Sequence, residues 1–75
     1  MNKVRRQQLA KCLSDLETVK DALESIRYDE EDYFNNMPEN LQCSQRGIDS
    51  EDAIDKMNDA VSAIEEAVGY VAEII

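Results

Sequence analysis

The side chains of this chain that could carry out chemistry are mostly carboxylates. The sequence has 17 Asp and Glu residues among 75, no histidine, and two cysteines, Cys12 and Cys43, too far apart in the sequence for a zinc-binding pair. Nucleophilic and acid–base catalysis therefore lack the side chains on which they usually depend. We expect a chain that is not an enzyme and that holds no metal ion and no cofactor.

Carboxylates are densest in the segment YDEEDYF, which contains four in succession: Asp29, Glu30, Glu31 and Asp32. Consecutive helical residues point in different directions, and the alternating ligands and glycine of a calcium loop are missing, so the pattern favours a solvated face over a cation site. Carboxylates are also disfavoured near the C-terminus of a helix. We expect Arg46, the backbone amides of the following loop or the basic groups of a partner to offset these acids.

The net charge of −9 is unevenly distributed along the chain. A field this negative repels nucleic acid, so we expect no direct binding to it. The first eleven residues hold no acid and four basic side chains: Lys3, Arg5, Arg6 and Lys11. These basic residues either grip a phosphate or nucleotide, or neutralise acids that an antiparallel partner helix brings alongside. The second interpretation is favoured, and its acids are Glu65, Glu66 and Glu73.

Two segments carry apolar residues at alternating intervals of three and four, which is the heptad pattern of helices packed along their length. A helix over about residues 3–34 is predicted by the first set, Leu9, Cys12, Leu16, Val19, Leu23 and Ile26. A helix over about residues 50–75, with Asp49 or Ser50 as its N-cap, is predicted by the second set, Ile54, Met57, Val61, Ile64, Val68, Val71 and Ile75.

The connection over about residues 35–49 contains the asparagine, proline and glycine residues that interrupt helices. Because the two helices are nearly equal in length, we predict a single all-α domain over residues 1–75, an antiparallel two-helix hairpin with heptad seams. Cys12 then lies far from Cys43, beyond the ~7 Å between Cα atoms that a disulfide tolerates. We therefore expect free thiols, with Cys12 a small core residue.

The second helix has more apolar surface than one partner helix can cover, because alanines and an isoleucine recur at intervals of seven beside its seam. A chain this short also buries little surface alone. We predict a homodimeric four-helix bundle or a higher oligomer. The residues predicted at the oligomer interface are Ala53, Ile54, Met57, Ala60, Val61, Ile64, Ala67 and Val68.

No stretch of the sequence is long and apolar enough to span a bilayer, and the amino end, MNKVRRQQLAKC, has no apolar segment typical of a signal peptide. Free cysteines are typical of a reducing compartment. We therefore expect a soluble cytoplasmic protein without a membrane partner.

Most of the aromatic and loop apolar residues lie beside the acidic cluster. They either cap the end of the bundle or form a recognition surface, since aromatic anchors with a charged rim are typical of protein interfaces. Different residues can serve each purpose, and the basic amino end stays an alternative functional surface. The candidate partner-binding residues are Asp29, Glu30, Glu31, Asp32, Tyr33, Phe34, Met37, Pro38, Leu41 and Arg46.

The segment YFNNMPENLQCSQRG resembles the loop of a family of small, mostly uncharacterised helical proteins encoded by bacteriophages and other mobile elements. That family combines an acidic helix end, an aromatic residue, NMPE(N/G)LQ, a serine and a basic residue followed by glycine. The matching positions are Asp29 to Asp32, Phe34, Asn36 to Gln42, Ser44, Arg46 and Gly47. The resemblance implies a phage-encoded accessory protein in a bacterial cytoplasm and supplies no enzymatic residue.

Three functions fit that context. The first is binding to, and inhibition of, a host protein that acts in defence or handles nucleic acid, with acidic helices standing in for phosphates. The second is an oligomeric sponge that sequesters a small signalling nucleotide between subunits, using Arg46 or the basic amino end together with an aromatic face. The third is a structural or assembly role in the virion. The net charge of −9 favours the first.

Overall fold

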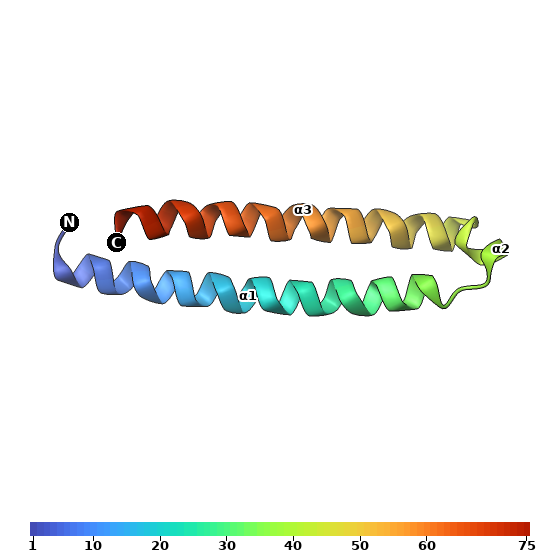
Figure 1. Ribbon diagram of the computed structural model, residues 1–75, viewed down its shortest axis with the longest axis horizontal. Helices are drawn as coiled ribbons and strands as arrows, with labels where there is room; N and C mark the ends of the chain where they lie inside the picture. Colours follow the sequence, from blue (N-terminus) through green and yellow to red (C-terminus); the bar gives the residue numbers. More distant parts are fainter.

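The computed structural model describes residues 1–75 as two long helices joined by a short one. Helix α1 comprises Lys3–Asn35, α2 comprises Glu39–Gln42 and α3 comprises Gln45–Ile74. The long helices lie antiparallel and side by side, with α2 at the loop end (Figure 1). The result is a rod of 58 × 15 × 12 Å. The predicted all-α antiparallel hairpin is confirmed.

Helix α1 has side-chain partners at both of its ends. At its start, Asn2 Oδ1 accepts a hydrogen bond from the backbone N–H of Arg5 at 2.8 Å, which caps the helix. At its end, the Phe34 carbonyl accepts from the backbone N–H of Met37 at 3.1 Å and from Gln42 Nε2 at 3.1 Å. The end of α1 is therefore tied to the last residue of α2.

Helix α3 begins at Gln45, about five residues before the start that the sequence predicts. Ser44 is the extended residue before it, and Gly47 lies inside the first turn rather than ahead of it. Gly47 is buried, and a Cβ atom there would lie 2.1 Å from the carbonyl oxygen of Gln42. Glycine at this position is therefore a point of close contact between α2 and α3, not an interruption of a helix.

A polar contact near mid-length defines the register of the two long helices. Arg27 Nη1 donates a hydrogen bond to Asn58 Oδ1 at 2.9 Å, across the hairpin. Counting outward from this pair in opposite directions along the two helices places Leu9 about opposite Ile75. Residues 3–8 therefore extend past the end of α3, as Figure 1 shows at the open end of the hairpin.

The row of α3 that α1 covers is the predicted heptad seam. Val61, near the middle of α3, is only 5% exposed. The other seam residues before the last are half-buried: Ile54, Met57, Ile64, Val68 and Val71.

The covered row of α1 differs from the predicted one. Half-buried residues recur at heptad spacing as Leu9, Leu13, Leu16, Lys20, Leu23, Arg27, Glu30 and Phe34. By contrast, Cys12, Val19 and Ile26 are exposed. The long aliphatic stems of lysine, arginine and glutamate can cover apolar surface while their charged ends reach the edge, so polar residues can occupy an inner row.

The core of a single chain is small. Met37 at 8% exposure and Val61 at 5% are its only buried apolar side chains. Since burial of apolar surface supplies most of the favourable free energy of folding, a lone hairpin of this kind is expected to be marginally stable.

Both cysteines are free, and both are exposed. The prediction of Cys12 as a core residue is wrong for the single chain, because this residue lies on the uncovered side of α1. Neither long helix has the length and apolar character to cross a membrane.

Candidate functional site

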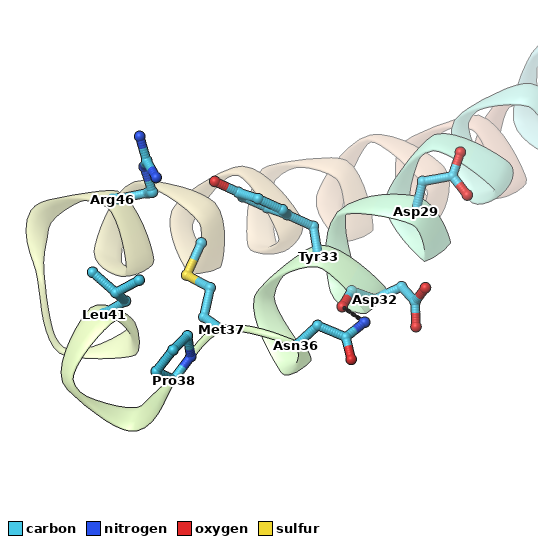
Figure 2. Close-up of a pocket in the computed structure, with 8 residues that line it drawn as sticks. All are labelled: Asp29, Asp32, Tyr33, Asn36, Met37, Pro38, Leu41 and Arg46. Atoms are coloured by element: carbon cyan, nitrogen blue, oxygen red, sulfur yellow. Dashed lines mark hydrogen bonds between the residues drawn. The ribbon is translucent and has the colours of Figure 1, made fainter.

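A hollow of about 430 Å³ lies at the loop end of the hairpin. Figure 2 shows apolar side chains from the loop gathered there, with Tyr33 and Arg46 beside them and the acids further along α1. The lining residues are Asp29, Asp32, Tyr33, Asn36, Met37, Pro38, Leu41 and Arg46. Seven of the ten residues predicted to bind a partner thus lie together in this hollow. They come from the end of α1, the connection to α2, α2 itself and the start of α3.

The floor of the hollow is held by the loop. Met37 directly precedes Pro38 in the connection from α1 to α2, and it is only 8% exposed, which anchors the connection on the bundle. Pro38 precedes α2 with φ −57° and ψ 149°, an extended conformation that turns the chain away from α1. Leu41, on α2, remains partly open at 37% exposure. The floor therefore combines a buried methionine with two apolar residues, Pro38 and Leu41, that are open to the solvent.

The four successive acids point in different directions, as expected for a helix. Asp29 and Asp32 are exposed and line the hollow. Glu30 and Glu31 are half-buried, and Glu31 Oε1 lies 3.7 Å from Arg27 Nε. Two carboxylates of the cluster therefore border the hollow, whereas a third interacts with the seam.

The acids on the rim of the hollow have no ion-pair partner. The ion pairs of the chain are Lys11 with Asp15 and Arg27 with Glu31. Arg46, expected to offset the cluster, lines the same hollow without forming an ion pair with either rim carboxylate. Their negative charge is consequently available to a positive group from outside the chain.

The basic amino end does not pair with α3 either. Neither ion pair joins the two helices, so the predicted neutralisation of Glu65, Glu66 and Glu73 is not formed. Lys3, Arg5 and Arg6 lie in the turns of α1 that extend past the end of α3, and Lys11 pairs with Asp15 on its own helix. One end of the rod is therefore basic, and the other is acidic.

The other predicted site residues are partly or fully buried within the hairpin. Phe34 is half-buried beside the seam, consistent with a cap at the end of the bundle. Among the residues predicted at the oligomer interface, Val61 is buried against α1 within one chain, and the rest are half-buried: Ala53, Ile54, Met57, Ala60, Ile64, Ala67 and Val68. No group of side chains is arranged as a set of metal ligands.

Comparison of the chain with protein families, with curated proteins and with solved structures finds no match. The geometry of the loop end therefore carries the functional argument.

Sequence reasoning missed two contributors to this end of the molecule. Asn36 lines the hollow, and its Nδ2 donates to the Asp32 carbonyl at 2.8 Å. Gln42 ties α2 to the end of α1. The asparagine carried a detectable signal, since it directly precedes the Met-Pro pair that ends the helix, whereas the partner of a glutamine side chain depends on the tertiary fold.

Proposed function

We propose that this chain is a small accessory binding protein, a homo-oligomeric hairpin that recognises a protein partner through its acidic loop end. The observation that supports the proposal is the hollow that combines an apolar floor with exposed, unpaired carboxylates on its rim. A partner of matching chemistry presents an apolar side chain flanked by lysine or arginine. The oligomer is a homodimeric four-helix bundle or a higher assembly.

Charge and shape favour such a partner. The net charge of −9 attracts basic proteins over distances beyond direct contact, which raises the rate of association. Tyr33 is 47% exposed at the hollow, and a partly open tyrosine supplies a large contact area at low entropic cost. The partner-binding set is the one that the sequence predicts at this end, with Asn36 added.

The resemblance of the loop to phage-encoded proteins gives this binding a biological setting. In that setting the partner is a host protein of the bacterial cytoplasm that acts in defence or binds nucleic acid. Its basic surface normally faces phosphates, and carboxylates on a rigid helix occupy that surface in their place. The expected outcome of binding is inhibition.

The test is retention of host proteins from bacterial lysate by the tagged chain and by two variants of equal net charge. In the first variant, Gln replaces Asp29, Glu30, Glu31 and Asp32. In the control, Asn or Gln replaces four exposed acids that recur at intervals of seven along α3: Asp52, Asp59, Glu66 and Glu73. Wild type and control are expected to retain the same basic protein, and the first variant to lose it.

Retention that both variants lose equally would indicate nonspecific attraction to net charge and would contradict the proposal. Raised salt is a further check, since screening shortens the range of charge attraction and is expected to weaken retention. The first variant is also expected to be at least as resistant to heat as the wild type, because its acids oppose the dipole at the end of α1. A clear fall in its melting temperature would contradict that account of the cluster.

A second candidate function is a sponge for a small signalling nucleotide. It is favoured by the presence of Arg46 and Tyr33 in the same hollow, a cation for a phosphate and a ring for a base. The rim carboxylates oppose it, because they repel phosphate. A rise in melting temperature with nucleotides, which Arg46→Gln abolishes, would favour the sponge over protein binding.

A further inference from the structure

One side of the hairpin is acidic along its length. Arg27 donates a hydrogen bond to Asn58 on α3 and lies beside Glu31 on its own helix. Asn58 and Glu31 therefore lie on the same side of the seam. In an antiparallel pair, reversing one helix brings corresponding heptad positions to the same side, so the rows of seven through these residues share that side. They are Glu17, Glu24 and Glu31 on α1, and Glu51, Asn58 and Glu65 on α3.

The opposite side is apolar, and we call it the apolar flank. It contains the row Cys12, Val19, Ile26 and Tyr33 of α1 and the row Ala53, Ala60, Ala67 and Ile74 of α3. The α1 row is exposed, with Ile26 at 56%. On α1 the seam therefore covers the row that contains Lys20 and Arg27, and it leaves exposed the more apolar row that contains Val19 and Ile26.

Three surface hollows follow one another along this flank. One contains Tyr33 at the loop end, a second lies between Cys12 and Val19, and a third contains Arg5 and Cys12 near the open end. Arg5 continues the same row of seven. A surface that is apolar and indented over most of a 58 Å rod is a surface shaped for another elongated body.

We propose that the apolar flank binds a second copy of this chain, with the loops at opposite ends of a four-helix bundle. The inference rests on the homo-oligomeric part of the proposed function and specifies its face and orientation. One whole side of the rod covers about 58 × 15 Å, a projected area of about 870 Å², which leaves room for the ~800 Å² that each partner contributes to a stable interface. A second copy thus supplies the apolar burial that one chain lacks.

The flank is self-complementary about a two-fold axis at its middle. An axis that crosses α1 between Val19 and Ile26 places these two residues opposite each other in the two copies, and it places Cys12 opposite the partner's Tyr33. The register of the hairpin carries the same axis to α3 midway between Ala60 and Ala67, which then also face each other. Small side chains meet large ones at the ends, and residues of intermediate or equal size meet in the middle.

Charge selects this orientation over one with both loops at the same end. The overhanging first turns of α1 are basic and carry no acid, and they would lie beside the loop end of the second copy. That end carries five acids and no basic residue between positions 29 and 39: Asp29, Glu30, Glu31, Asp32 and Glu39. Placing the loops together would instead bring ten such acids to one end of the bundle.

The occupant that this arrangement gives the loop-end hollow is the Val-Arg-Arg segment at residues 4–6 of the second copy. It has the chemistry that the hollow favours, an apolar residue followed by two basic ones. A host protein that binds the same hollow in the dimer therefore displaces this amino-terminal segment, while the rest of the flank stays paired.

The first test compares Ile26→Lys with Ile48→Lys by sedimentation and circular dichroism at equal chain concentration. The two isoleucines are matched, at 56% and 53% exposure, but only Ile26 belongs to the flank. Wild type and Ile48→Lys are expected to sediment as dimers of the 8.5 kDa chain, and Ile26→Lys as a monomer or with lost helical content. A monomeric wild type, or an Ile26→Lys variant that stays dimeric, would overturn the proposal.

The second test fixes the orientation with disulfides in a chain carrying Cys12→Ser and Cys43→Ser. The double substitution Val19→Cys and Ile26→Cys is expected to yield a covalent dimer under oxidising conditions. A bond within one chain is excluded, because the two positions lie about 10 Å apart along α1. Ala60→Cys with Ala67→Cys gives an independent link on α3. A dimer that neither pair links would overturn the orientation.

Failure of the dimer is distinguishable from failure of host binding. If both proposals hold, the Ile26→Lys chain, whose loop-end hollow is unoccupied, is expected to retain more host protein from lysate than the wild type does. A monomeric wild type that retains a host protein would overturn the dimer alone. A disulfide-linked dimer whose Ile26→Lys counterpart keeps its helical content but retains no host protein would support the dimer and count against host binding. If Ile26→Lys loses its helical content, the comparison uses the four-glutamine variant and its control on α3 instead.

Discussion

The two ends of this hairpin are built differently. At the loop end, α1, α2 and α3 are joined by a side-chain hydrogen bond from Gln42, the close approach at Gly47 and the buried Met37. At the open end, no side-chain hydrogen bond crosses between the long helices, and the terminal isoleucines of α3 are exposed. Contacts within one chain are therefore sufficient to hold the turn, whereas the open end depends on contacts with another molecule for its stability.

The largest expected effect is that of Gly47→Ala at the loop end. The added methyl group would lie 2.1 Å from the Gln42 carbonyl oxygen, which is backbone and cannot move aside without displacing α2. We expect a loss of unfolding free energy on the order of 3 kcal/mol, measured by urea denaturation at fixed chain concentration. A near-neutral result would show that α2 is not held tightly.

Truncation of apolar side chains sharpens the comparison between the ends. Met37→Ala removes a buried side chain at the loop end and is expected to lower the unfolding free energy by about 2–3 kcal/mol. Leu9→Ala removes a half-buried one at the open end and is expected to cost about half as much in dilute solution. Thermal denaturation over a range of concentrations checks this, because the Leu9 effect should grow where the dimer forms. Equal costs for the two substitutions would remove the distinction between the ends.

The polar contact between the ends is expected to have an intermediate effect. Asn58→Ala removes the acceptor of the Arg27 guanidinium, whose Nε already lacks a hydrogen-bond partner. The expected loss is about 1 kcal/mol, since the arginine is only partly buried and can reach water. Ser62→Ala, an exposed substitution on the same helix, is the control for helix propensity. If the two variants unfold alike, the contact defines the register without stabilising it.

The smallest expected effect has the opposite sign. Gly69 lies inside α3 towards the open end, and a Cβ there would meet nothing within 4 Å. Gly69→Ala is therefore expected to raise the unfolding free energy by about 0.5–1 kcal/mol, through the greater helix propensity of alanine. Melting curves of Gly69→Ala and Gly47→Ala would then show a rise in melting temperature for the first variant and a fall for the second. A destabilised Gly69→Ala chain would indicate that a partner chain packs closely there.

The heptad spacing was sufficient to predict two long helices, because apolar periodicity reports directly on which residues share a face. Their nearly equal lengths were sufficient to predict the antiparallel hairpin. It could not predict which face of α1 turns inward. Lys20, Arg27 and Glu30 occupy the covered row, and nothing in a local pattern ranks them above Val19 and Ile26. That choice follows from the register, which the loop and the Arg27–Asn58 contact determine together.

The candidate site was predictable in its composition but not in its shape. Aromatic, acidic and loop apolar residues are adjacent in the sequence, so their proximity follows from the chain itself. The early start of α3 is different, because it depends on the fit of Gly47 against Gln42. A glycine that permits a tertiary contact and a glycine that ends a helix look the same in a single sequence.

The antiparallel register also has a consequence for how the chain folds. Contacts near Phe34 and Ser50 close a loop of about 16 residues, whereas contacts near Leu9 and Ile75 close one of about 66. Each doubling of loop length costs about 0.6 kcal/mol of chain entropy, so pairing is easiest beside the turn and grows outward from it. The two long helices are therefore expected to pair first beside the turn, with Met37 and Gly47 in the folding nucleus. Pairing then extends along the helices, and the amino end of α1 packs last.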